Sequence, residues 1–283
     1  MRGSGAIENN IRWRVGASGS GHTLNRSGFG GNVGAAYASK APKDGYTLLM
    51  CAVTAASISQ TLTPEQITYN LEADFAPISM LGKAPLALVV NASMPVTSLK
   101  EYIAYAKQRP KQVTFSSAGI GTTQHLGGEL FQLMTGTQLV HVPYKGSGPS
   151  MTDLLGGQVQ STFETGPAIA PFLKSPKLRI LAYANETRSS VMPEVPTTAE
   201  AGLPGFTVAA TYGLLAPAGT PQAIIDKLNA EVKTLLNLPE VKATLAQQGV
   251  EPTYTTAKQT SAQIHREISK WAKVIKDANV KAQ

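Results

Sequence analysis

The chain has 283 residues, of which 42% are hydrophobic and 15% charged, and a formal net charge of +7. This length allows a large buried core and two domains or lobes, and no apolar run approaches the roughly 20 residues of a membrane span. Lys and Arg are scattered rather than clustered, which argues against a nucleic-acid partner and favours a mild positive field that attracts small anions.

The N-terminus and the cysteine usage bear on location. Met1 to Gly5 looks like a vector-derived leader, and no apolar signal-peptide core follows it. The single cysteine, Cys51, has no disulfide partner and is expected to be a buried thiol in a strand. One cysteine fits either the cytoplasm or a bacterial periplasm.

Short apolar strands alternate with helical patterns along the first part of the chain. In order, the patterns predict an exposed strand at 11–15, a short helix at 35–40, strands at 46–51 and 85–90, and a helix at 98–107. Thr54 and Ser57 follow the strand at 46–51, at the end where ligands of open α/β sheets bind.

The stretch at 113–131 is the most informative one. A β-branched and aromatic run at 113–115 predicts a buried strand, and 116–121 is small, polar and glycine-rich. A helix is expected to start near Thr122 behind a Ser/Thr cap. Unpaired N–H groups and the positive end of the helix dipole would then meet at one point, which is an anion site. The alternative is an ordinary tight turn between strand and helix.

The same arrangement of strand, polar loop and helix start recurs twice. A strand at 137–142 leads to a helix with Pro149 at its first position, and a strand at 158–163 leads to a helix opened by 164–167. The remaining predicted elements are a strand at 178–184, a short helix at 195–202, a β-type run at 206–215 that bridges two lobes, and helices from 221 to the end.

The candidate chemistry leaves two alternatives open. His22, His125, His141 and His265 lie far apart and match no metal-ligand spacing, so no metal and no cofactor is expected. No Gly-x-Ser-x-Gly motif occurs. A hydrolase would use Ser116 or Ser117 as the nucleophile, His125 as the base and Glu164 as the group that orients the base.

A packing role for His125, one turn into its helix, is favoured over that hydrolase. Glu164 is the acidic residue expected to face the site and to accept from a ligand hydroxyl or amine. Its plain alternative is a helix N-terminal carboxylate that the dipole favours. Tyr144 and Lys145 either face the cleft or cover a turn.

Several segments together resemble one family, the Bug-type substrate-binding receptors of tripartite tricarboxylate transporters. They include Ala-Pro-Lys-Asp-Gly-Tyr-Thr-Leu-Leu and His-Val-Pro-Tyr-Lys-Gly. In family order they lie at 25–35, 41–49, 115–131, 141–146, 153–157, 193–202 and 215–221. The resemblance covers essentially residues 25–283.

The resemblance implies an α/β, two-lobed periplasmic-binding fold (type II-like), each lobe a mainly parallel sheet flanked by helices, which closes over a small organic carboxylate. It implies a periplasmic receptor that works with membrane transporter subunits, without inserting into the membrane and without enzymatic activity. The ligand contacts that it implies are Thr54, Ser116, Ser117, Ala118, Gly119, Gly121, Thr122, Thr123, Glu164 and Thr165. The family often carries Asp where this chain has Glu164, so the choice of ligand stays open.

The expected lobes are 1–91 with 217–283, and 92–216, and the chain is expected to cross between them near Val90 and Leu215. Residues 1–24 form an atypical leader. They lack the apolar strand, ligand loop and first helix with which the family begins, which predicts an incomplete first lobe and weakened ligand binding.

Overall fold

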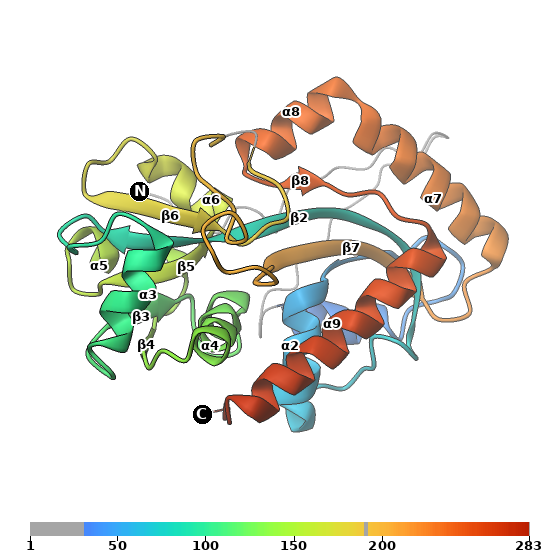
Figure 1. Cartoon of the computed structure of the whole chain (residues 1–283). Coiled ribbons are helices and arrows are strands. Elements are labelled where there is room, and N and C mark those ends of the chain that lie inside the picture. The colour runs from blue at the N-terminus through green and yellow to red at the C-terminus, as the bar shows by residue number, and fades with distance from the viewer. Residues whose placement is uncertain (1–30, 190–191, 283) are drawn as a thin grey trace.

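The structure, a computed structural model, describes residues 31–189 and 192–282 (Figure 1). Its helices are α1 (Asn32–Ala38), α2 (Val53–Leu62), α3 (Leu99–Lys107), α4 (Thr123–Thr135), α5 (Ser147–Leu155), α6 (Gly166–Ile169), α7 (Gln222–Asn237), α8 (Pro239–Gln247) and α9 (Ala257–Asp277). Its strands are β1 (Leu49–Ala52), β2 (Phe75–Asn91), β3 (Thr114–Ser117), β4 (Val140–Pro143), β5 (Ser161–Thr165), β6 (Leu178–Tyr183), β7 (Ala209–Pro217) and β8 (Glu251–Pro252). Within these ranges no helix combines the length and apolar character needed to cross a membrane. The expectations for the leader and for a strand at 11–15 lie outside the described residues.

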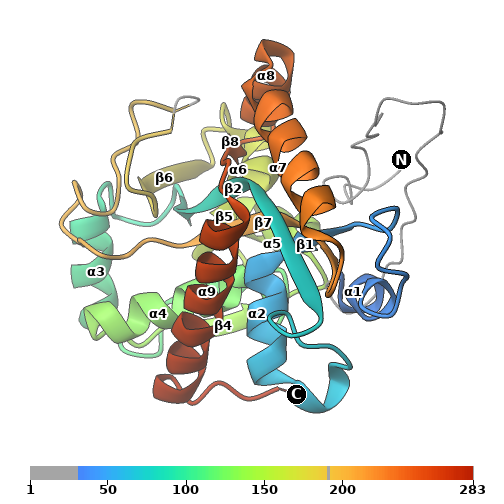
Figure 2. The same ribbon diagram turned by 90° about the vertical axis from the view of Figure 1, so that its right-hand side faces the viewer.

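Strand β2 is the element around which the sheet is built. Its first part, Phe75–Pro85, pairs with β7, and its second part, Leu86–Asn91, pairs with β5 and β6. The described strands follow the order β1-β7-β2-β5-β3-β4, and β6 and β8 also pair with β2. Strands β2 and β7 therefore run side by side through the middle of the molecule (Figures 1 and 2). The change of partners after Pro85 does not test the predicted lobe boundaries, which stay predictions.

Strand β2 is much longer than the predicted strand at 85–90. Pro77 and Pro85 interrupt the sequence pattern of a strand, because proline cannot donate to a sheet. The register shifts between Pro77 and Ser79, so Pro77 lies beside an irregularity of the ladder. Pairing with β7, a contact between distant segments, extends β2 through this proline-containing part.

Helices cover both faces of the sheet, so β2 is buried on both sides. Leu86, Leu88 and Val90 pack with α3, α4 and α9, whereas Ala87 and Val89 pack with α5 and α6. Side chains of a strand alternate between faces, which explains the division. Around the first part of β2, α7 covers one face, and α2 and α9 cover the other. The predicted α/β class is confirmed.

The prediction of mainly parallel sheets needs correction. Strand β3 is parallel to β4 and to β5. The pairs that β2 makes with β5, β6, β7 and β8, and the pair of β1 with β7, are antiparallel. The reason is that β2 and β7 pass through the centre in opposite directions and supply most of the pairing.

Two further local predictions change. The stretch at 195–202 forms turns instead of a helix, although Thr197 and Glu200 bond each other's backbone N–H at 2.8 and 3.1 Å, as at a helix start. Gly202, with a φ of 97°, and Pro204 end the turn before a helix can propagate. Helix α5 begins at Ser147, so Pro149 is its third residue. An N–H at this position has no partner within a helix, so proline is tolerated there.

Strand β1 is shorter than the predicted 46–51, and Tyr46 is 94% exposed. Cys51 lies buried in β1 as expected, and burial raises the pKa of its thiol to about 12. A thiol with this pKa stays protonated and unreactive at neutral pH.

Candidate functional site

The carboxyl ends of β3, β4 and β5 lie together at one edge of the sheet. Ser117 stands opposite Pro143, and Ser116 stands opposite Thr162. Because neighbouring strands are about 4.8 Å apart, the three ends lie within roughly 10 Å of one another. Each strand leads into a helix, so the starts of α4, α5 and α6 converge there. The predicted threefold repeat of strand, loop and helix start is confirmed.

We call the three junctions, 118–122, 144–146 and Thr165, the carboxyl-edge site. In the first junction Gly119 and Gly121 have φ values of 141° and 76°, which favour glycine. Thr122 is the N-cap of α4, as predicted.

The cap and the helix together create an anion-binding position. The Thr122 hydroxyl donates to the Gly119 carbonyl at 2.7 Å and accepts from the His125 N–H at 3.4 Å. The N–H groups of Thr123 and Gln124 precede this bond, and such first-turn groups have no partner within a helix. The dipole of the 13-residue helix α4 adds partial positive charge at the same place. The start of α4 therefore favours an anionic group.

Buried polar side chains support the loop from below. The Ser117 hydroxyl lies 2.7 Å from Nε2 of His141 and accepts the Gly119 N–H at 3.1 Å. The His141 and His125 rings stack with centroids 3.9 Å apart. Nδ1 of His125 accepts the Gly121 N–H at 3.2 Å. Both glycines of the loop are thus tied to the histidine pair.

Glu164 connects the three helix starts. It is fully buried on the penultimate residue of β5 and directly precedes Thr165, the N-cap of α6. Its Oε1 accepts from Nε2 of Gln124 at 2.9 Å and from the N–H of Thr165 at 2.8 Å. The Gln124 amide also lies 3.5 Å from the Ser147 hydroxyl. Gln124 lies in the first turn of α4, Ser147 begins α5 and Thr165 precedes α6. Glu164 therefore binds the starts of α4 and α6 directly and the start of α5 through Gln124.

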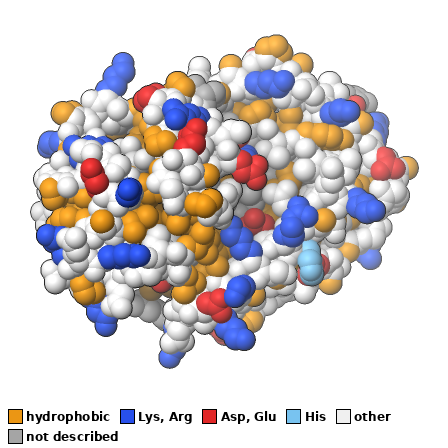
Figure 3. All heavy atoms as spheres, in the orientation of Figure 1, with side chains coloured by type: hydrophobic (Ala, Val, Ile, Leu, Met, Phe, Trp, Pro, Cys, Tyr) orange, Lys and Arg blue, Asp and Glu red, His pale blue; other side chains and the backbone are white. Residues whose placement is uncertain are grey.

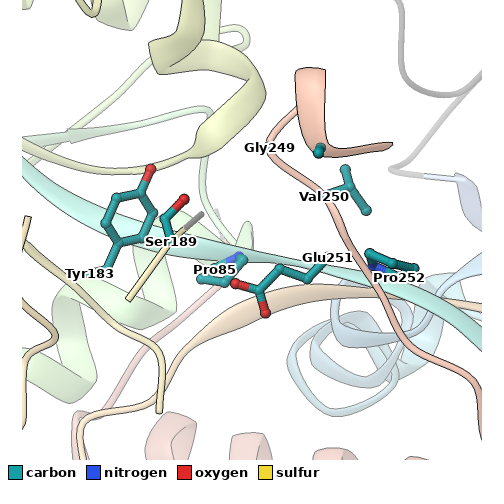
Figure 4. Close-up of a pocket in the computed structure, with 8 residues that line it drawn as sticks. Pro85, Tyr183, Ser189, Gly249, Val250, Glu251 and Pro252 are labelled. Atoms are coloured by element: carbon teal, nitrogen blue, oxygen red, sulfur yellow. The ribbon is translucent and has the colours of Figure 1, made fainter. Parts of the chain in front are cut away.

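A small hollow elsewhere on the molecule is too small to be the ligand site. It is lined by Pro85, Tyr183, Ser189, Ala246, Gly249, Val250, Glu251 and Pro252 (Figure 4). Its volume of about 70 Å³ is far below the roughly 300 Å³ at which ligand pockets begin. None of the predicted ligand residues lines it. The Glu251 carboxylate beside it is bound to Asn185 at 2.8 Å and pairs with Lys83 at 3.4 Å.

The family described as tripartite tricarboxylate transporter family receptor matches residues 23–280. The chain belongs to this receptor family.

Individual relatives agree with the assignment. The receptor is 40% identical over 258 residues to Protein BugT of Bordetella pertussis, covering 91% of this chain and 79% of BugT. It is 36% identical to R. palustris Rpa4515 with adipate, with a TM-score of 0.78 over 91% of this chain and 86% of that one. It is 30% identical to MatC from Rhodopseudomonas palustris with bound malate, with a TM-score of 0.71 over 88% of this chain and 85% of that one. Another solved relative is described as the periplasmic binding protein BugD, at 29% identity, a TM-score of 0.75, and 92% and 87% coverage. These relatives are substrate-binding receptors, not enzymes.

The structure brings most of the predicted ligand residues of this receptor to the carboxyl-edge site. Five of these residues are partly exposed at the site, namely Ala118, Gly119, Gly121, Thr122 and Thr165. Buried beneath it are Ser116, Ser117, Thr123 and Glu164. The partly exposed members present mainly backbone and small side chains.

Thr54 is not brought to this site by any contact of its side chain. Its hydroxyl lies 2.8 Å from the Thr211 hydroxyl and donates to Oε2 of Glu267 at 3.1 Å. The far end of the same helix, Leu62, approaches the loop at Gly121. Thr54 lies eight residues earlier, roughly 12 Å along the helix. Its hydroxyl joins α2, β7 and α9.

The serine and histidine arrangement of the hydrolase alternative is not formed. The Ser117 hydroxyl pairs with His141 instead of His125, and the Ser116 hydroxyl accepts from Ser150 at 2.7 Å. Both serines are 0% exposed, so a substrate carbonyl has no access to either oxygen. Nδ1 of His125 is occupied by a loop N–H. The receptor's family assignment agrees with this geometry.

The sequence did not indicate three residues that hold the carboxyl-edge site in place. Gln124 donates to both Glu164 and Ser147, and His141 lies in hydrogen-bond contact with Ser117. Polar residues at helix starts are common on surfaces, so periodicity carries no signal for such pairing. The Tyr144 hydroxyl, for which a place at the cleft and a place over the turn were both open, donates to Oδ2 of Asp153 at 2.6 Å.

The buried histidine predicts a pH dependence of stability. Burial lowers the pKa of His125 to about 4, below its usual 6.5. As pH falls from 6.5 towards 4, His125 becomes protonated in the unfolded chain but stays neutral in the folded chain, so the receptor loses stability. At about pH 5 this contribution amounts to roughly 2 kcal/mol. Replacing His125 by Gln keeps an acceptor for Gly121 and removes the titration.

The measurement is urea unfolding at about pH 7.5 and about pH 5. The loss of stability between these values should be smaller in His125→Gln by roughly 2 kcal/mol. Glu129, 3.7 Å from Nε2 of His125, acts in the opposite direction, because burial raises its pKa to about 7 and its contribution is lost as pH rises from 4.5 to 7. Both proteins are therefore compared in a Glu129→Gln background, with His265→Gln as the exposed control. An unchanged pH profile in His125→Gln contradicts the prediction.

Proposed function

We propose that this receptor captures a small organic carboxylate at the carboxyl-edge site, in the periplasm, and presents it to the membrane subunits of a tripartite tricarboxylate-type transporter. The observation that carries the proposal is the convergence of three helix starts on partly exposed loops of small residues. Two solved relatives, Rpa4515 and MatC, hold adipate and malate, which supports a carboxylate as the ligand class.

The binding mode that we propose relies on backbone donors. Free N–H groups at the start of α4 and the hydroxyls of Thr122 and Thr165 would bind the carboxylate directly or through water. Lys and Arg are interspersed with Asp and Glu over the face in Figure 3, without one dense basic block on that face. The mild positive charge then assists encounter, and the helix starts supply the specific contacts.

Closure of two lobes over the ligand belongs to the same proposal. The lobes would be 1–91 with 217–283, and 92–216. Strands β1 and β2 run in one direction while β5 runs in the other, so the carboxyl ends of β1 and β5 point towards each other along β2. Ala52 at the end of β1 pairs with Tyr212 of β7, which in turn pairs with Gly82 of β2. Thr165 at the end of β5 pairs with Leu86 of β2. Measured along β2, the two ends are offset by four residues, roughly 13 Å, and β7 and β2 lie between the two strands.

The test is titration calorimetry against mono-, di- and tricarboxylates, including adipate and malate. At least one acid should bind the parent protein. Ala118→Asp places a second negative charge on the partly exposed loop and should weaken that binding by about 100-fold, since like charges at an interface cost several kcal/mol. Gln108→Asp, on the exposed C-cap of α3, is the matched control and should bind as the parent does.

Circular dichroism and the unfolding midpoint confirm that each variant is folded. The absence of binding to every acid by the folded parent would overturn the proposed function. Equal binding by Ala118→Asp and the parent would instead move the site away from the carboxyl edge.

A further inference from the structure

The two oxygens of the buried Glu164 carboxyl group are used very differently. Oε1 accepts from the Gln124 amide at 2.9 Å, from the Thr165 N–H at 2.8 Å and from the Thr165 hydroxyl at 3.2 Å. Oε2 is completely buried and has no hydrogen-bond partner in the part of the chain that the structure describes. A carboxylate would leave one charged oxygen unsatisfied there, which is costly in a buried position. A proton on Oε2 removes that cost.

Within residues 31–189 and 192–282, no charged group is paired with Glu164. The elements that pack against β5 are β2, β3, α4, α5 and α6. Titratable or charged side chains on them are Lys83 of β2, His125 and Glu129 of α4, and Asp153 of α5, while Lys145 and Tyr144 precede α5. Lys83 pairs with Glu251 instead. Among the described residues, none of the ion pairs includes Glu164.

The surroundings of the Glu164 carboxyl group also favour its protonated form. Burial raises the pKa of Glu164, and this outweighs the hydrogen bonds from Thr165 and Gln124, which lower it. The dipoles of α4 and α5 favour the charged form in the free receptor. An anion bound at the same helix starts opposes that form, because two negative charges would then share one positive end.

We propose that binding of a carboxylate at the carboxyl-edge site is coupled to uptake of one proton by Oε2 of Glu164. The inference rests on the proposed function. The proton comes from solvent, and Glu164 becomes a neutral acid beneath the bound anion. A unit charge about 8 Å away at an effective dielectric constant of about 20 changes proton affinity by roughly 30-fold. By linkage, ligand affinity then weakens by the same factor as pH rises and Glu164 loses its proton in the free receptor.

Glu164 is therefore a positioning residue whose charge state sets the affinity. Gln reproduces the neutral acid: its amide oxygen can accept from Gln124 and Thr165 as Oε1 does, and its NH₂ takes the place of a protonated Oε2. Glu164→Gln should bind the ligand without uptake of a proton. Glu129→Gln is the matched control, because Glu129 is a partly buried carboxyl group on α4 whose ion pair is with His125 and not with the helix starts of α5 and α6.

The experiment uses the acid that binds best in the panel described above. Calorimetry in buffers of different ionisation enthalpy, from about pH 5 to about pH 9, reports proton uptake and the dissociation constant together. The parent and Glu129→Gln should take up protons and should lose affinity by roughly 30-fold over this range. Glu164→Gln should show neither effect while still binding.

The outcomes separate the two proposals. Binding by the parent without proton uptake, or uptake that persists in Glu164→Gln, overturns the proton coupling and leaves the receptor function standing. Loss of uptake in Glu129→Gln with retention in Glu164→Gln also overturns it. If the folded parent binds no acid at all, the proposed function fails and the coupling fails with it.

Discussion

Replacing Phe131 by Ala is expected to lower the free energy of unfolding by about 4 kcal/mol, the range for a fully buried aromatic side chain. Phe131 is 0% exposed on α4. Its ring lies 5.9, 5.1 and 5.7 Å from the rings of Tyr102, Phe163 and Phe206. Such aromatic contacts add to the area that the ring buries. The truncation would leave a cavity between α3, α4 and β5 that these rings cannot fill.

Urea unfolding followed by circular dichroism measures this effect. Leu133→Ala is the control on the same helix, because Leu133 is 43% exposed and should change stability by no more than about 0.5 kcal/mol. Similar losses for Phe131→Ala and Leu133→Ala would show that α4 is not anchored by the face described here.

The second large effect is expected from Gly128→Ala on the same helix. A Cβ atom at Gly128 would lie 2.2 Å from Cε2 of Phe115, a distance that requires displacement of a buried ring. Phe115 is 0% exposed and stacks on His141 with centroids 4.9 Å apart, so it has little freedom to move. Overpacking of this kind costs about 3 kcal/mol, which exceeds the gain of about 1 kcal/mol from the better helix propensity of Ala.

Gly156→Ala is the matched control for this substitution. Gly156 follows α5 with a φ of −78°, and a Cβ there would be 3.5 Å from its nearest neighbour. The same chemical change should therefore be neutral or stabilising by up to about 1 kcal/mol. Thermal unfolding of both variants decides the matter. A stable Gly128→Ala protein would mean that Phe115 is not held where the structure places it.

Local chemistry was enough to predict the central part of the site. Helix α4 begins where its Thr cap and following apolar residues predicted, and the glycine-rich loop before it has positive φ at Gly119 and Gly121. Caps and glycines act over one to four residues, so the sequence carries their signal directly. The threefold repeat of strand, loop and helix start was predicted for the same reason. The receptor family followed from the ordered segments between residues 25 and 221, and the match at 23–280 confirms it.

Long-range pairing decided the features that were missed. Strand β2 extends back to Phe75 through two prolines because β7 lies alongside it, and this contact joins segments more than a hundred residues apart. The same antiparallel pairing replaced the mainly parallel sheets that the family resemblance implied. The turns at 195–202 show the converse case, in which a local helix signal was not extended by neighbouring residues.

The fate of individual polar side chains also depended on the tertiary structure. From the sequence, Ser117 could pair with His125, and Glu164 could face a ligand or cap a helix. Parallel pairing of β3 with β4 places His141 beside Ser117 instead. The packing of α4, α5 and α6 on β5 buries Glu164 among three helix starts. The sequence by itself therefore determined the family, the α/β class and the loop that begins α4. Which groups are buried, paired or left without a partner was decided only by the tertiary structure, because these properties depend on contacts between residues distant in the chain.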